Sequence, residues 1–130
     1  MDKKEILKYI ASVRKEYGDA RLLRNNDYRH TLLTVPEHQI VLYTLRPRED
    51  IPSEVHKDGV QVLFVLRGKM YTHIGNDVKF TEAEDSVIVR ANTRHYIANG
   101  NTDENLHVIS YYSPPVWPVD YVEKRQGSAK

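Results

Sequence analysis

Four polar side chains near the middle of the sequence have types and spacings suited to metal binding. Glu54 and His56 are two residues apart, so on a strand their side chains leave the same face. A tight turn over residues 57–59 predicts a β-hairpin whose returning strand brings Gln61 opposite them. His95 supplies a second imidazole further along the chain. Divalent transition metals accept a ligand set of one carboxylate and two imidazoles, and an amide carbonyl can join it.

These residue types alone leave a second interpretation open. Glu54, His56 and Gln61 could instead form the polar, solvent-facing side of an edge strand. The sequence contains no cysteine, so a metal would have only nitrogen and oxygen ligands. It also has no glycine-rich phosphate loop, nucleophile elbow or HExxH motif. The sequence therefore offers no second set of catalytic residues that competes with this group.

The strands that must position these side chains are predicted by apolar residues that alternate with a period of two. Short runs rich in Val, Ile, Leu and Tyr predict strands over residues 38–46, 60–68, 69–75, 86–91 and 106–113. Polar turn sequences containing Gly, Asn, Asp or Pro separate these runs. Closely spaced strands with polar turns indicate an antiparallel sandwich or barrel.

The two ends of the chain have a different character from the strand-rich middle. Apolar residues at helical spacing, from Ile6 to Tyr17, predict an amphipathic helix over residues 2–17. The tail after Ser113 contains three prolines, so we expect it to run extended over the surface rather than continue a central strand. At 130 residues the chain has the length of one domain.

The strand predicted from residue 60 onward is apolar on both faces. Val62, Phe64 and Leu66 point one way, while Leu63 and Val65 point the other way. Either the N-terminal helix or the same sheet of a second subunit must cover the outer face, because apolar patches of that size are uncommon on monomers. We favour a homodimer.

Two stretches of the sequence resemble the two conserved motifs of the cupin family. Glu54-x-His56-x4-Gln61-x6-Gly68 has the spacing of the first motif, and EDSVIVRANTRHYIAN, residues 84–99, is similar to the second motif. Glu54 stands where the first motif has a histidine, and Gln61 stands where it has a glutamate. The carboxylate has therefore changed position, and the formal charge of a divalent site would stay at +1.

The resemblance implies an all-β, single-domain cupin jelly-roll β-barrel of the RmlC-like type, with a short N-terminal α-helix. Within it we expect the helix and lead-in over residues 1–24, the barrel over 25–115 and an extended tail over 116–130.

The resemblance also implies one divalent metal ion, with Fe, Mn, Zn and Ni left open. Its ligands would be Glu54, His56, Gln61 and His95, although Gln61 could hydrogen-bond a metal-bound water instead. We expect an enzyme of the isomerase, lyase or dioxygenase type that acts on a small polar molecule. Three alternatives remain open: a binding module without turnover, a metal-free barrel resembling the sugar-nucleotide epimerases, and an interaction protein with a vestigial site.

Two further residues are candidates for catalytic roles. Tyr112 shares a strand face with Val108 and Ser110, so its hydroxyl could be a hydrogen-bond donor or general acid in the barrel, or it could be a packed core side chain. Arg90 stands where the second cupin motif has a proline. It could bind a substrate carboxylate or phosphate at the barrel mouth, or form a surface salt bridge.

The charge pattern narrows the choice of partners. The formal net charge is +1, and acidic and basic residues are scattered without a basic stripe, so nucleic acid is not an expected partner. No segment has the length and apolar character of a membrane span, and the N-terminus lacks the apolar core of a signal peptide. We therefore predict a cytoplasmic protein without a membrane partner.

Overall fold

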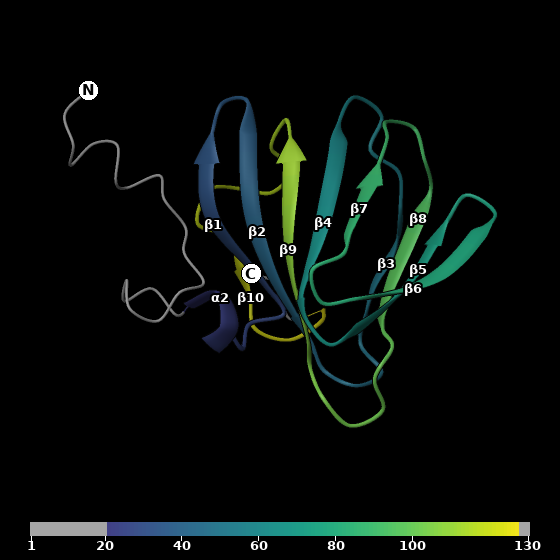
Figure 1. Ribbon diagram of the computed structural model, residues 1–130. Coiled ribbons are helices and arrows are strands. Elements are labelled where there is room, and N and C mark those ends of the chain that lie inside the picture. The colour runs from purple at the N-terminus through teal and green to yellow at the C-terminus, as the bar shows by residue number, and fades with distance from the viewer. Residues whose placement is uncertain (1–20, 128–130) are drawn as a thin grey trace.

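The computed structural model describes residues 21–127 and places two antiparallel β-sheets against each other (Figure 1). The described part of the chain forms ten strands and one short helix, α2, over Arg21–Arg24. This architecture confirms the all-β jelly-roll predicted from the sequence. The amphipathic helix predicted over residues 2–17 lies outside the described residues.

The larger sheet has six strands in the order β10-β1-β2-β9-β4-β7. All neighbouring pairs within it are antiparallel. Its strands in sequence order are β1 Arg29–Val35, β2 His38–Leu45, β4 Val60–Arg67, β7 Ser86–Val89, β9 Leu106–Ser113 and β10 Val122–Glu123.

The smaller sheet has four strands in the order β3-β8-β5-β6, also antiparallel. Its strands are β3 Asp50–Glu54, β5 Lys69–Ile74, β6 Asp77–Glu82 and β8 His95–Asn99. Figure 1 shows its strands on the right, facing β4 and β7 of the larger sheet.

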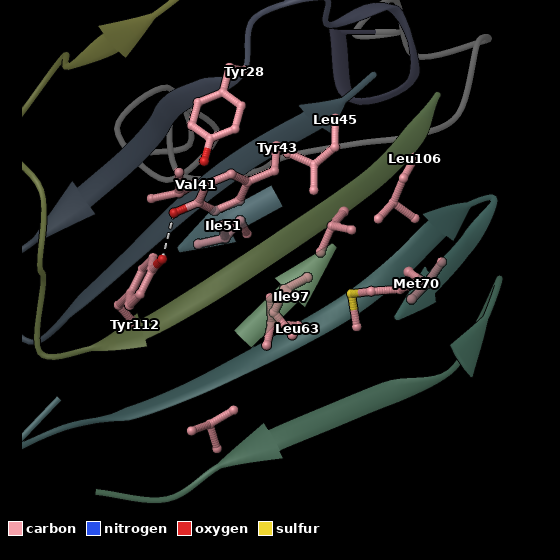
Figure 2. Packing of buried hydrophobic residues seen from close by; sticks show 13 residues of the cluster. Tyr28, Val41, Tyr43, Leu45, Ile51, Leu63, Met70, Ile97, Leu106 and Tyr112 are labelled. Atoms are coloured by element: carbon pink, nitrogen blue, oxygen red, sulfur yellow. Dashed lines mark hydrogen bonds between the residues drawn. The ribbon is translucent and has the colours of Figure 1, made fainter. Parts of the chain in front are cut away.

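The core lies between the two sheets and follows the predicted alternation. On β4, Gln61, Leu63 and Val65 point into this interior and are buried. Figure 2 shows Leu63 packed near Met70 and Ile97, which come from the opposite sheet. The strand geometry therefore turns the Gln61 face of β4 toward the barrel interior.

The other face of β4 is apolar as well, as the sequence predicted. Phe64 and Leu66 are half-buried and pack with Leu22 of α2 and with Leu42 and Ile109. The short helix therefore covers part of the outer face of the larger sheet.

The prediction of a β-hairpin around residues 57–59 is wrong, because the strands on either side of this turn do not pair with each other. The strand before the turn, β3, pairs with β8 in the smaller sheet, whereas β4 pairs with β7 and β9 in the larger one. Residues 57–59 therefore carry the chain from one sheet to the other. A polar turn between two strands does not determine whether they pair with each other. Here the buried Gln61 side chain points into the barrel interior from the larger sheet, whereas Glu54 belongs to the smaller sheet.

The chain after Ser113 returns along the larger sheet. β10 pairs with β1, and the Trp117 ring packs against the core cluster. Part of the tail that we expected on the surface is thus a strand at the edge of the sheet. No helix among residues 21–127 is long and apolar enough to cross a membrane.

Candidate metal centre

Glu54, His56 and His95 meet at one end of the barrel interior. Glu54 Oε1 lies 3.1 Å from His56 Nε2 and 3.5 Å from His95 Nε2. One ligand atom from each of the three side chains lies within 4.8 Å of the others. These separations suit an ion that sits about 2.0–2.2 Å from nitrogen and oxygen ligands.

The local backbone explains how Glu54 reaches this position. Glu54 is the last residue of β3 and pairs directly with His95, the first residue of β8. The ladder shifts register between Ile51 and Glu54, where Pro52 has no N–H to donate. β3 lies at the edge of its sheet, where a proline is tolerated.

His56 follows the strand and is fixed by a loop from the second motif. Its carbonyl oxygen accepts a hydrogen bond of 2.8 Å from the backbone N–H of Asn92. Its ring lies 5.2 Å from the His95 ring, centroid to centroid. The loop that leads to His95 therefore also holds His56 in place.

The Glu54 carboxylate is held in its charged form. Burial opposes its ionisation, but hydrogen bonds from His56 and His95, and the positive charge that these rings carry when protonated, outweigh burial and lower the pKa of Glu54 to about 2. The site therefore contains one anion at neutral pH.

In the neutral form of the buried His95 side chain, the ring hydrogen belongs on the nitrogen that faces away from Glu54. Its Nδ1 lies 3.0 Å from the carbonyl oxygen of Thr93, which can only accept, so Nδ1 carries the hydrogen in the neutral ring. His95 is 1% exposed, and its Nε2 has no hydrogen-bond partner among the described residues. In that tautomer the Nε2 lone pair faces the Glu54 carboxylate, an arrangement that a cation between the two atoms would stabilise.

Gln61 contributes a second buried acceptor atom that receives no hydrogen bond from residues 21–127. Its Nε2 donates to Ser110 Oγ at 2.9 Å and to the Tyr112 hydroxyl at 3.1 Å. Its Oε1 has no partner within the described part of the chain, although Gln61 is 1% exposed. Buried acceptors of this kind are rare and fit a ligand to an ion or to a metal-bound water.

Tyr112 lies inside the barrel beside this group. Its ring meets the His56 ring edge-on at 5.6 Å, and its hydroxyl lies 2.7 Å from that of Tyr43. Burial, with the neighbouring Tyr43 and Glu54, raises the pKa of Tyr112 well above its usual value. Tyr112 therefore keeps its proton at neutral pH, and its hydroxyl can act as a hydrogen-bond donor.

Arg90 is not brought into this group. Arg90 directly follows β7 and is exposed. The alternation along the strand places it on the same side as the exposed Ile88, opposite the buried Val89. Among residues 21–127, no hydrogen bond or ion pair joins it to the other candidate residues.

A cavity of about 280 Å³ lies between the β5–β6 hairpin and β7. Ile74, on its wall, pairs with His95 across the ladder, whereas Glu54, His56 and His95 do not line the cavity themselves. The Thr72 hydroxyl in its wall is buried and has no hydrogen-bond partner among the described residues. The other lining residues are Asp77, Lys79, Thr81 and Val87.

Sequence reasoning missed three residues that shape the site. Thr93 fixes the His95 tautomer through a backbone oxygen, which leaves no trace in residue type. The Ser110 hydroxyl accepts a hydrogen bond from Gln61, and the Tyr43 hydroxyl contacts that of Tyr112. Ser110 was noted only as a face neighbour of Tyr112, and the period-two pattern of β9 could have placed it beside the ligands.

Comparisons with known proteins agree with this fold. Residues 41–112 match the Cupin domain family. Protein L612 of Acanthamoeba polyphaga mimivirus is 31% identical over 121 residues, which cover 91% of this chain and 72% of that protein. Protein YrkC of Bacillus subtilis (strain 168) is 30% identical over 113 residues, covering 82% of this chain and 60% of YrkC.

A solved structure has the same architecture. The crystal structure of BH2720 from Bacillus halodurans matches with a TM-score of 0.82 and 23% sequence identity, and the match covers 91% of this chain and 89% of that chain. This likeness supports the fold, and the family match and the mimivirus relative supply the assignment. The chain belongs to the cupin family.

Proposed function

We propose that this cupin binds one divalent metal ion through Glu54, His56 and His95, with Gln61 as a fourth ligand or as the partner of a metal-bound water. The observation that carries the proposal is the buried His95 Nε2, which has no hydrogen-bond partner among residues 21–127 and faces Glu54 Oε1 at 3.5 Å. Nitrogen and oxygen donors of this kind suit Fe, Mn, Zn or Ni. One carboxylate with two neutral imidazoles would leave the site with a net charge of +1.

We also propose that the ion serves chemistry on a small polar molecule. A bound ion would supply Lewis-acid or oxygen-activating chemistry. The protein's own residues would have the other tasks: Glu54 balances charge and Tyr112 donates a hydrogen bond. The cavity lined by Ile74, the neighbour of His95 across the ladder, gives room for a small molecule. The reaction would be of the isomerase, lyase or dioxygenase type. Arg90 stays a predicted anion-binding residue at the barrel mouth.

A homodimer and a cytoplasmic location also stay predictions. The half-buried apolar side chains on the outer face of the larger sheet, such as Phe64 and Leu66, support a second copy as the partner.

The enzymatic part is tested by incubating the metal-loaded protein with a panel of small carboxylic acids, keto acids and sugars and analysing the mixtures by mass spectrometry. We expect product formation with the wild type and loss of product with His95→Ala. The matched control is His73→Ala, which removes an exposed histidine of β5 outside the ligand group and should retain activity. A compound that the wild type retains but never consumes would contradict the enzymatic proposal and indicate a binding module.

A further inference from the structure

A buried chain of hydrogen bonds links the candidate metal centre to the opposite edge of the larger sheet. Gln61 Nε2 donates to the Tyr112 hydroxyl at 3.1 Å, and the Tyr112 and Tyr43 hydroxyls lie 2.7 Å apart. Figure 2 shows these two hydroxyls facing each other inside the barrel. Arg29 Nε then donates to the Tyr43 hydroxyl at 3.2 Å. The chain therefore crosses β4, β9, β2 and β1 without leaving the interior.

The far end of this chain is anchored by a fixed charge. Arg29 is 6% exposed and forms an ion pair with Glu123 of β10, which is 4% exposed. Its guanidinium carbon lies 3.8 Å from the centroid of the Trp117 ring. A guanidinium group stays protonated in proteins and only donates hydrogen bonds. Arg29 therefore imposes a direction on the bonds that follow.

Donor and acceptor accounting gives that direction. Because Arg29 donates, the Tyr43 oxygen accepts, and the Tyr43 hydrogen then needs an acceptor. In the described part of the chain, the acceptor within reach of the Tyr43 hydroxyl is the Tyr112 oxygen. The opposite direction would leave the Tyr43 hydrogen unpaired in a fully buried position, which native cores avoid.

One hydrogen is left over at the end of the chain. The Tyr112 oxygen accepts from both Tyr43 and Gln61, so the Tyr112 hydrogen is not used by either contact. The Tyr112 ring meets the His56 ring edge-on, with centroids 5.6 Å apart, so the Tyr112 side chain borders the candidate metal centre. A hydrogen-bond donor is thus presented beside the ligand group with its acceptor missing from the described residues.

We propose that Arg29 and Tyr43 are positioning residues that hold the Tyr112 hydroxyl as a hydrogen-bond donor to an oxygen atom of a metal-bound small molecule. The ligand class that fits is a small carboxylate, or another molecule that brings an anionic oxygen to the ion, since this oxygen can accept from Tyr112 while it binds the metal. The hydroxyl keeps its proton throughout. This inference rests on the proposed metal site.

The test uses oxalate as the probe and the Co(II)-loaded full chain, with oxalate binding followed by the cobalt d–d absorption. Tyr112→Phe removes the donor, so we expect oxalate to bind about tenfold more weakly, as for one hydrogen bond to a charged acceptor. The affinity for Co(II) itself, measured by chelator competition, should stay within about threefold of the wild type because the metal ligands are unchanged.

Tyr43→Phe tests the positioning role. It leaves the Tyr112 hydroxyl in place but removes the group that fixes its direction, and we expect oxalate binding to weaken at least about threefold. The double variant Tyr43→Phe/Tyr112→Phe should bind oxalate as weakly as Tyr112→Phe alone, because the hydroxyl that Tyr43 orients is gone.

The matched control is Tyr28→Phe. Tyr28 is buried in the same cluster, and its hydroxyl donates to the Asp50 carbonyl oxygen at 2.5 Å, outside the chain of bonds described here. Tyr28→Phe should bind oxalate like the wild type. Wild-type protein that binds Co(II), combined with equal oxalate affinities in Tyr112→Phe and Tyr28→Phe, would overturn this inference and leave the metal site standing. Wild-type protein that binds no Co(II) would overturn both proposals.

Discussion

The Nδ1 atom of His95 lies 3.0 Å from the carbonyl oxygen of Thr93, two residues earlier in the chain. This contact keeps the ring hydrogen on Nδ1 and leaves Nε2, buried and without a partner among the described residues, to face Glu54. A histidine that binds a metal through one nitrogen commonly donates its other N–H to a carbonyl or carboxylate. The short loop before β8 thus prepares His95 for metal binding.

Replacing Gln61 by glutamate should tighten metal binding. The buried Oε1 of Gln61 has no donor within the described part of the chain. Gln61→Glu should therefore place a second negative charge beside the ion, and we expect the affinity for the metal to rise about tenfold. Without metal the added buried charge should lower the melting temperature. Thermal unfolding with and without metal measures both effects.

The control for that change is Gln39→Glu. Gln39 is fully buried, but it is bonded to Trp117 and lies outside the ligand group. The Gln39→Glu variant should lose the same amount in melting temperature with and without metal. Equal responses of Gln61→Glu and Gln39→Glu to added metal would contradict the role assigned to Gln61.

The buried pair of Arg29 and Glu123 should stabilise the fold strongly. Glu123→Ala leaves the Arg29 charge unpaired in the interior, so we expect a loss of about 3–5 kcal/mol in the free energy of unfolding, measured with urea. Lys124→Ala removes a neighbouring ion pair to Asp27 whose lysine side chain is 76% exposed, and it should cost less than about 1 kcal/mol. Similar losses in the two variants would argue against a structural role of the buried pair.

Acid should destabilise the protein in part through His107. Burial, and then the nearby Arg67, lower the pKa of His107. Above about pH 6.5 the ring is neutral in both the folded and the unfolded chain, so it contributes nothing to the pH dependence. As the pH falls below that value, the unfolded chain binds a proton that the folded protein resists, and the free energy of unfolding decreases until the lowered pKa is reached.

Urea unfolding of metal-free protein at pH 7.5 and pH 5.5 tests this expectation. His107→Gln should lose less stability between the two pH values than the wild type, by up to ~1.4 kcal/mol for each unit of pKa shift. His73→Gln, at an exposed position, should keep the wild-type difference. An unchanged pH dependence in His107→Gln would show that another group carries the effect.

The predicted homodimer can be tested on the outer face of the larger sheet. Ile88 of β7 is 64% exposed and pairs with Val62 of β4, so a charge there would interrupt an apolar interface. We expect the wild type to elute as a dimer in size-exclusion chromatography with light scattering, and Ile88→Glu to elute as a monomer. Phe80 of the smaller sheet is 52% exposed, and the Phe80→Glu variant should remain dimeric. A monomeric wild type at micromolar concentration would contradict the prediction.

The sequence predicted much of the fold because alternation along β2, β4 and β9 is strong. All three strands lie within one residue of the predicted bounds. It did not predict β6, where Asp77, Lys79 and Glu82 hide the apolar alternation in an exposed edge strand. Alternation also says nothing about which strand pairs with which, and for this reason the expected hairpin between β3 and β4 was wrong.

The candidate site was predicted in its ligand residues but not in its surroundings. Spacing and the cupin resemblance singled out Glu54, His56 and His95, which the structure brings together. The chain from Gln61 to Arg29 was not predictable, because Arg29 and Glu123 are 94 residues apart and their contact depends on the complete sheet. No local pattern of residue types reports a contact of that range.

The most direct test of the metal site is the metal content of protein purified without a chelator or histidine tag, measured by inductively coupled plasma mass spectrometry. The double variant His56→Ala/His95→Ala, purified in parallel, removes both imidazoles of the group. We predict close to one equivalent of a single divalent metal in the wild type and its loss in the variant. A wild type without metal even after reconstitution, or a variant that retains the same amount, would contradict the proposed site.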